Sequence, residues 1–165
     1  MTTETNTDIL NGLRVLIVDD EPDVLETLQD LLPMCHTTCA GSFEEAREAL
    51  EKQEFDLAIL DIMGVSGYEL LSICRRKGIP AVMLTARALS ADDVKKSFTE
   101  GAAYFLPKEE MVNIASFLAE IMSARAAGRN TWSGWYKRLA SFCERTFGPD
   151  FKKKDSDFWD KITYY

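Results

Sequence analysis

The sequence predicts a doubly wound α/β fold, in which a five-stranded parallel sheet is covered by helices on both faces and followed by a C-terminal α-helical extension. Five short apolar runs, each too short for a helix, end in polar or glycine-bearing stretches, which is typical of strands buried in a parallel sheet. Between these runs, apolar residues recur at helical spacing, so strands and helices alternate along the chain. The expected strands are 13–18, 35–40, 55–61, 79–85 and 102–106.

The composition indicates a globular protein. The chain has 165 residues, of which 46% are hydrophobic, enough for one domain with a core. No stretch approaches the roughly 18 to 20 apolar residues of a membrane span, and the first eight residues lack the features of a signal peptide, so we expect a cytoplasmic protein. The four cysteines show no C-x-x-C spacing and are expected to be free thiols rather than zinc ligands. His36 is the only histidine, which excludes chemistry built on a histidine pair.

The net charge of −8 is unevenly distributed. Residues 1–124 carry 10 basic and 22 acidic side chains, a balance of −12, whereas residues 125–165 carry the other 9 and 5, a balance of +4. An acidic surface repels phosphate groups, so the first part is not expected to bind nucleic acid by itself.

The first three helices carry start and stop signals. Pro22 suits a first helical turn, and the apolar residues after it follow helical spacing. Ser42 and Glu45 predict a capping box for the second helix. Gly67 opens the third helix, and Gly78 is placed to end it after three basic residues.

The alternation of strands and helices continues after Gly78. Ser90 with Asp93 marks the start of a fourth helix, and Gly101 ends it. A strongly periodic fifth helix is expected after the last strand. Its apolar residues are Met111, Val112, Ile114, Ala115, Phe117, Leu118, Ile121 and Met122.

Polar side chains gather where four of the strands end. Asp19 and Asp20 follow the first strand, Asp61 ends the third, Thr85 ends the fourth, and Lys108 follows the fifth. The carboxyl edge of such a sheet is where ligands bind. Taken alone, Asp61 is equally explained as an acid that caps the next helix. Adjacent acids at one edge need solvation or a cation, however, and Mg²⁺ prefers one or two carboxylates together with water.

These segments together resemble the receiver domain of two-component response regulators. The resemblance rests on VDDEP (18–22), LAILDI (57–62), VMLTA (82–86) and GAAYFLPK (101–108). Each piece is common by chance, whereas their order within a (βα)5 pattern is specific. The resemblance covers residues 12 to about 125. Together with the polar start and the aromatic periodicity of the tail, it predicts a flexible N-terminus at 1–11, a flavodoxin-like receiver domain at 12–127 and an aromatic-rich helical extension at 128–165.

The resemblance implies a phosphoacceptor with a metal site. Asp61 is the expected acceptor, and its carboxylate would form an acyl phosphate. Asp20 and Asp61 would bind Mg²⁺, with Asp19 acting through water and the backbone carbonyl of Met63 completing the site. The metal and Lys108 would offset the negative charge of the phosphoryl oxygens.

The resemblance also implies a conformational switch. Thr85 supplies a hydroxyl that follows the phosphoryl group. Phe105, three residues before Lys108, would turn inward behind it, although a plain core aromatic is the alternative. A partner is expected to bind the face formed by the fourth helix, the fifth strand and the fifth helix.

Two features depart from the family pattern. Asp61 and Gly67 are six steps apart with no proline between them, where the family usually has eight steps and a proline, so the shorter loop is expected to affect the metal-ligating carbonyl. The family usually has a cis proline after the lysine. Here Glu109 follows Lys108 and Pro107 precedes it, so a trans bond is expected and the lysine must be aimed differently.

The last forty residues match no family that we recognise. Between Trp132 and Phe147, aromatic and apolar residues recur at three- and four-residue steps, and basic residues lie on the other face. Gly148 and Pro149 end this helix, and a final aromatic stretch follows at 158–165. These aromatic residues are expected to pack on the receiver domain or on a second copy of the chain. A partner-docking helix and a membrane-surface helix are the alternatives.

The sequence therefore predicts a response regulator without an enzymatic or DNA-binding output domain. A sensor histidine kinase or a phosphotransfer protein would phosphorylate Asp61, and the signal would pass through contacts with a downstream protein or within a homodimer. The alternative is a phosphorylation-independent module that uses the same fold and its tail to dimerise or dock. An independent phosphatase or nucleotide-binding enzyme is disfavoured, because no glycine-rich phosphate loop follows the first strand. Nucleic-acid and membrane partners are not expected.

Overall fold

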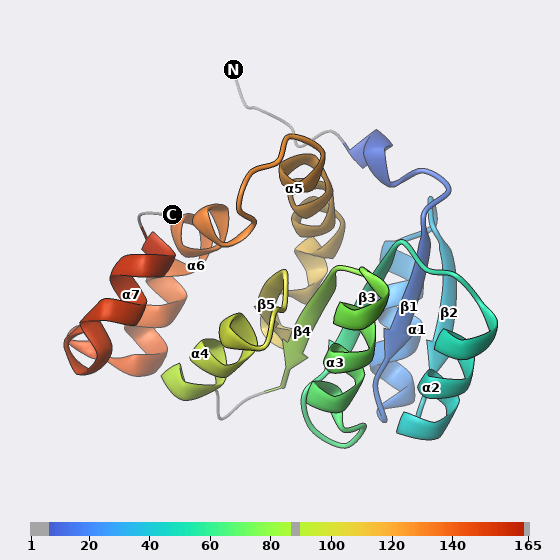
Figure 1. The fold of residues 1–165 in the computed structure, drawn as a ribbon, viewed down its shortest axis with the longest axis horizontal. Helices are drawn as coiled ribbons and strands as arrows, with labels where there is room; N and C mark the ends of the chain where they lie inside the picture. The colour runs from blue at the N-terminus through green and yellow to red at the C-terminus, as the bar shows by residue number, and fades with distance from the viewer. Residues whose placement is uncertain (1–6, 87–89, 164–165) are drawn as a thin grey trace.

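The computed structural model describes residues 7–86 and 90–163. Its five strands form one all-parallel sheet in the order β2-β1-β3-β4-β5 (Figure 1). The parallel sheet and its alternation with helices confirm the predicted doubly wound α/β fold. The strands are β1 (Arg14–Val18), β2 (His36–Ala40), β3 (Leu57–Asp61), β4 (Ala81–Thr85) and β5 (Tyr104–Pro107).

Helices cover both faces of the sheet. In Figure 1, α2, α3 and α4 lie on the side facing the viewer, and α1 and α5 lie behind. The strand order reverses at the neighbouring pair β1 and β3, which is the point where ligands bind in open α/β sheets. The helices are α1 (Pro22–Leu31), α2 (Phe43–Lys52), α3 (Gly67–Lys77), α4 (Ala91–Thr99) and α5 (Ile114–Ala126).

The predicted capping box at Ser42 and the predicted helix start at Ser90 form to different extents. Ser90 accepts a hydrogen bond from the backbone N–H of Asp93, and the Asp93 carboxylate accepts one from Ser90 in return. Ser42 accepts from the N–H of Glu45 at 3.2 Å, but the Glu45 carboxylate accepts from the N–H of Gly41 at 2.9 Å. The helix start is therefore as predicted, and the reciprocal bond moves one residue outward.

The N-terminal segment joins the folded unit earlier than predicted. Thr7–Leu10 form the 3-10 helix η1, and Leu10 is fully buried in the core, against α5. One apolar residue held in this way fixes a segment that its polar composition made appear loose. The remaining residues of the predicted flexible N-terminus, 1–6, lie outside the described residues.

The fifth helix begins later than its apolar pattern predicted. Residues Lys108–Asn113 form a second 3-10 helix, η2, and α5 starts only at Ile114. Val112 is 69% exposed, so it does not belong to the buried face on which it was placed. The tighter turn after Lys108 rotates this part of the chain out of the register of α5.

The C-terminal extension (residues 128–165) folds against the five-stranded unit. It consists of α6 (Trp132–Phe147), the 3-10 helix η3 (Phe151–Asp155) and α7 (Ser156–Thr163), which lie beside α4 in Figure 1. Its aromatic side chains are buried within one core shared with the sheet domain, which agrees with the first of the predicted packing alternatives. The last two tyrosines lie outside the described residues. Within the part of the chain that is described, no helix is both long and apolar enough to cross a membrane.

Candidate functional site

The fold brings the predicted polar residues together at one edge of the sheet. Asp61 is the last residue of β3 and Thr85 is the last residue of β4, while Lys108 directly follows β5. Asp19 and Asp20 directly follow β1, the neighbour of β3. Because all five strands run parallel, their carboxyl ends meet at this edge. The sequence prediction of a convergent site is thus confirmed in its geometry.

The three aspartates form a tight carboxylate cluster. One oxygen from each of Asp19, Asp20 and Asp61 lies within 4.8 Å of the others. Asp19 is fully buried and Asp61 is 4% exposed, while Asp20 faces solvent. Burial and the charges of Asp19 and Asp20 together raise the pKa of Asp61 to about 7, although the nearby Lys108 lowers it. The cluster is therefore short of positive charge.

Lys108 is the cation of the site. Its Nζ lies 2.8 Å from Oδ2 of Asp19, 3.6 Å from Oδ1 of Asp61 and 3.6 Å from Oε2 of Glu21. Burial alone would lower the pKa of Lys108, but its close contact with Asp19 and the charges of Asp61, Asp19 and Glu21 raise it. The lysine therefore stays charged. In the unmodified chain, it lies closest to Asp19 rather than to Asp61.

The donor set fits a small hard cation. Asp19 Oδ1 accepts from the backbone N–H of Glu21 at 2.9 Å. Asp19 Oδ2 is buried, forms an ion pair with Lys108 Nζ and has no hydrogen-bond partner among the described residues, so this oxygen keeps lone pairs for a cation. Three carboxylates with one exposed member leave room for bound water, as Mg²⁺ requires. A group of this kind occurs nowhere else among the described His, Cys, Asp and Glu residues.

Two glycines allow the shortened loop after Asp61 to pack closely. At Gly64, whose φ is +84°, a Cβ atom would lie 2.4 Å from Oδ2 of Asp20. At Gly67, a Cβ atom would lie 2.2 Å from the carbonyl oxygen of Asp61. The loop thus contacts both an acidic side chain and the backbone of the central aspartate. The side chain of Met63 is 73% exposed, and the role of its carbonyl as a metal ligand stays a prediction.

A known protein family has this arrangement. The family model described as the response regulator receiver domain matches residues 15–118 of the chain. The chain belongs to this family. The match includes every residue of the receiver's carboxylate cluster together with Thr85 and Lys108, and it stops before the extension begins.

Characterised relatives are themselves response regulators. The two-component response regulator ARR12 of Arabidopsis thaliana is 36% identical over 129 residues, which are 69% of this chain and 22% of that protein. The heme response regulator HssR of Staphylococcus saprophyticus is 37% identical over 112 residues, which are 62% of this chain and 50% of that protein. The receiver chain thus spans half or less of the length of these two relatives.

Solved receiver structures share the fold. A CheY-like receiver domain protein from Methanospirillum hungatei is 26% identical with a TM-score of 0.57, and the alignment covers 68% of this chain and 98% of that one. The receiver domain of Francisella response regulator 1452 is 22% identical with a TM-score of 0.61, covering 70% of this chain and 99% of that one. The second likeness supports the fold alone.

The structure also shows how the two switch residues of the receiver lie. Thr85 is buried at the end of β4, and Phe105 is fully buried on β5. The burial of Phe105 agrees with a core aromatic, and an inward turn of its ring behind Thr85 stays a prediction. Every peptide bond between described residues is trans, including the one after Lys108. Lys108 is aimed by the 3-10 turn η2, which begins at this residue immediately after Pro107.

Three contributors to the receiver site were missed from the sequence. Glu21 was seen only as part of an acidic run, and its ion pair with Lys108 depends on the turn after β1. Gly64 was seen only as a loop residue, although a glycine three residues after Asp61 in a shortened loop signals close packing. The extension was expected to pack, but its position over β5 has no sequence signal.

Proposed function

We propose that this chain is the receiver of a phosphorelay and that it accepts a phosphoryl group on Asp61. The observation that carries the proposal is the buried carboxylate of Asp61 at the sheet edge, with Lys108 Nζ 3.6 Å away and two further aspartates within 4.8 Å. Membership of the receiver family and the response regulator relatives support it.

The transfer step needs an ionised acceptor. One carboxylate oxygen of Asp61 attacks phosphorus, and a new O–P bond forms while the bond from phosphorus to the donor breaks, so that the donor keeps the electron pair. The pKa of Asp61, raised to about 7 by burial and by its acidic neighbours, leaves the carboxyl partly protonated near neutral pH. The charge of Lys108 and a bound cation both favour the ionised form that attacks.

The acidic residues would hold Mg²⁺. Asp19, Asp20 and Asp61 supply carboxylate oxygens, and the carbonyl of Met63 is the further proposed ligand. When bound, the metal supplies positive charge that offsets the repulsion between these carboxylates and the incoming phosphoryl oxygens. Lys108 binds a phosphoryl oxygen, and the hydroxyl of Thr85 donates a hydrogen bond to another.

The partners follow from this chemistry. The phosphodonor would be a sensor histidine kinase or a phosphotransfer protein, and the output would be a contact with a downstream protein or a second copy of the chain. We propose no enzymatic output, because the extension places its aromatic side chains in packing against the receiver. The cytoplasm is the proposed location, which the four free thiols support.

Intact mass after incubation with acetyl phosphate tests the proposal. We expect one phosphoryl adduct that forms with Mg²⁺, does not form when EDTA is present and is absent from the Asp61→Asn variant. A sizing column run on the same samples reports any change of assembly. A folded protein that forms no adduct, or an adduct that survives Asp61→Asn, would overturn the assignment and favour the phosphorylation-independent module instead.

A further inference from the structure

The extension covers the surface formed by α4, β5 and α5, on which the family resemblance placed an external partner. On β5 and the two residues before it, two indole N–H groups and one hydroxyl of the extension donate to backbone carbonyl oxygens at 2.6–2.7 Å. The pairs are Thr131 with Ala103, Trp132 with Ala102, and Trp135 with Phe105. Both indoles are almost fully buried, so these bonds are shielded from water.

The extension also contacts α5. Arg138 Nη1 lies 2.7 Å from Oε2 of Glu120, and its guanidinium lies 3.9 Å from the ring centroid of Phe117. Gly134 permits this approach, since a Cβ atom there would lie 2.3 Å from Oε1 of Glu120. The two helices are thus closely packed at Gly134, where a larger side chain would have to displace the Glu120 carboxylate.

On α4, one aromatic residue anchors the extension. The ring of Phe98 packs edge-on against Trp132 at 5.4 Å and against Phe158 at 5.6 Å. Lys95, one turn earlier, forms an ion pair with Asp155. The extension therefore contacts α4 and β5 at the same time. It can keep both sets of contacts only while α4 and β5 keep their relative position.

Both α4 and β5 are adjacent in the chain to residues of the proposed phosphorylation site. β5 ends at Pro107, immediately before Lys108. The indole N–H of Trp135 donates to the carbonyl oxygen of Phe105, three residues before that lysine. α4 is the helix that follows Thr85 in the chain. A phosphoryl group on Asp61 adds roughly 1.5 to 2 negative charges, so Lys108, now closest to Asp19, is drawn toward it. A movement of Lys108 would displace the end of β5, to which the extension is hydrogen-bonded through Trp135.

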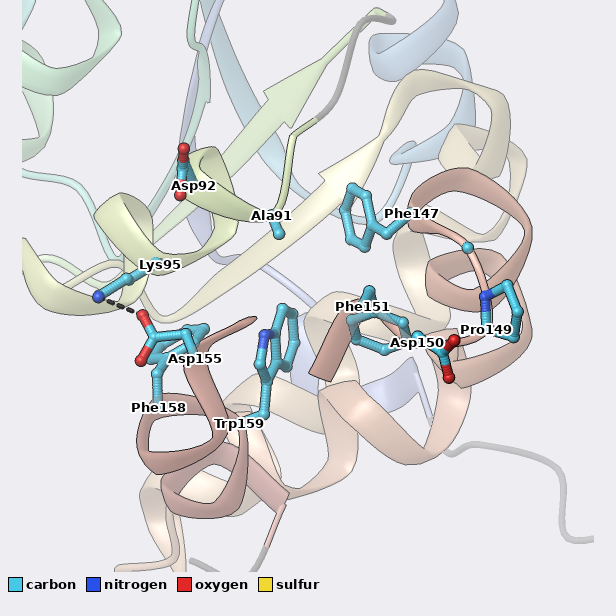
Figure 2. A pocket seen from close by; sticks show the side chains of 11 residues that line it. Ala91, Asp92, Lys95, Phe147, Pro149, Asp150, Phe151, Asp155, Phe158 and Trp159 are labelled. Atoms are coloured by element: carbon cyan, nitrogen blue, oxygen red, sulfur yellow. Dashed lines mark hydrogen bonds and ion pairs between the residues drawn. The ribbon is translucent and has the colours of Figure 1, made fainter. Parts of the chain in front are cut away.

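The extension does not pack tightly against the first turn of α4. A pocket of about 540 Å³ separates Ala91 and Asp92 from the rings of Phe147, Phe151 and Trp159 (Figure 2). Helices in this fold begin at the carboxyl edge of the sheet, so the opening lies at the end of α4 that faces the site. The first turn of α4 therefore has space to move without a clash.

We propose that the extension, residues 128–165, is the resident partner of the α4–β5–α5 surface, and that a phosphoryl group on Asp61 loosens its docking and so opens that surface to other proteins. The inference rests on the proposed function, because it takes Asp61 as the acceptor. It adds a specific output element, which lies beyond the part of the chain that matches the receiver family.

Tryptophan fluorescence tests the inference, because all three tryptophans of the chain lie in the extension and all three are buried. The full chain is treated with acetyl phosphate and Mg²⁺, and acrylamide quenching is measured on samples whose adduct fraction is known from intact mass. We expect the quenching constant to rise at least twofold in proportion to the adduct and to stay unchanged in Asp61→Asn. A complete adduct with unchanged or reduced quenching overturns the inference and leaves the proposed function standing. No adduct overturns both.

Linkage supplies a second test. If the docked extension opposes the modified state, weakening it must tighten binding of a phosphoryl analogue by the same factor. We expect Trp135→Phe, which removes one hydrogen bond and keeps an aromatic ring, to tighten binding of beryllium fluoride with Mg²⁺ by roughly 2- to 10-fold in calorimetric titration. Trp159→Phe is the matched control, because its ring packs on Phe151 and Phe158 inside the extension.

Asp155→Asn is a milder variant that keeps the core intact and removes only the ion pair with Lys95. It should tighten binding in the same direction by a smaller factor. Equal affinities in the wild type, Trp135→Phe and Asp155→Asn would show that the extension is a fixed part of the fold, and so would overturn the inference.

Discussion

Asp61→Asn is expected to stabilise the metal-free protein at pH 8 far more than at pH 5. The pKa of Asp61 is about 7 in the folded chain, because burial and the charges of Asp19 and Asp20 disfavour its ionised form. In the unfolded chain a normal aspartate has a pKa of about 3.9. The folded state therefore binds this proton more tightly, and between these two values the stability of the wild type falls as pH rises.

The size of the effect follows from the two pKa values. At pH 5 the folded carboxyl is still protonated, while the unfolded one is already ionised. Raising the pH to 8 then removes the folded-state proton and costs about 2.7 kcal/mol, from two pH units below a pKa of about 7. Asparagine does not titrate. The advantage of the variant should therefore grow by roughly 2 to 3 kcal/mol, or about 5–10 °C in Tm for a chain of this length.

Thermal and urea unfolding in EDTA at both pH values measure this difference. Asp56→Asn is the matched control, since the hydrogen bonds from Arg14 hold the pKa of Asp56 below its usual range and its effect should be constant between pH 5 and 8. Adding Mg²⁺ at pH 8 should stabilise the wild type more than Asp61→Asn. If the Asp61→Asn and Asp56→Asn variants show the same pH dependence, crowded negative charge at Asp61 is the wrong physical account.

Two more substitutions examine the same site. Lys108→Met leaves the fully buried carboxylate of Asp19 without its cation, and should destabilise the protein by about 3–5 kcal/mol in urea unfolding at pH 8 with EDTA; a loss below about 1 kcal/mol would contradict the ion pair. Gly64→Ala places a Cβ atom 2.4 Å from Oδ2 of Asp20 and should weaken Mg²⁺ binding by roughly 10-fold in calorimetry. Gly12 has a similar positive φ, +77°, and nothing within 4 Å of an added Cβ atom, so equal Mg²⁺ affinities in Gly12→Ala and Gly64→Ala would exclude the collision.

The sheet and the polar residues at its carboxyl edge could be predicted because their signals are local. Each buried strand is a short apolar run, and the residue that ends it lies at the carboxyl edge whatever the rest of the chain does. Asp61 and Thr85 therefore lie at the carboxyl ends of β3 and β4, as predicted. The start of α5 could not be found in this way, because Met111 and Val112 continue an apolar pattern that a 3-10 turn interrupts.

The position of the extension depends on contacts between distant residues. Periodicity identified the apolar face of α6, and Trp132 and Trp135 belong to it. Their N–H groups, however, bind backbone carbonyls about 30 residues away, and any residue type supplies such a carbonyl. Aromatic composition therefore predicted that the extension packs, whereas only the fold shows that it packs on β5.

The charges of the two parts decide what kind of coupling is physically reasonable. The extension carries 8 basic and 5 acidic side chains, a balance of +3, and residues 1–124 have a balance of −12, so a phosphoryl group on Asp61 would by itself increase the general attraction between them. That attraction is weak, because a unit pair at about 15 Å in water gains only about 0.3 kcal/mol before salt screens it over about 8 Å. Release must therefore come from movement of α4 and β5 under the contacts at Phe98 and Phe105. It should persist at 0.5 M salt, whereas a purely electrostatic response would have the opposite sign and would vanish there.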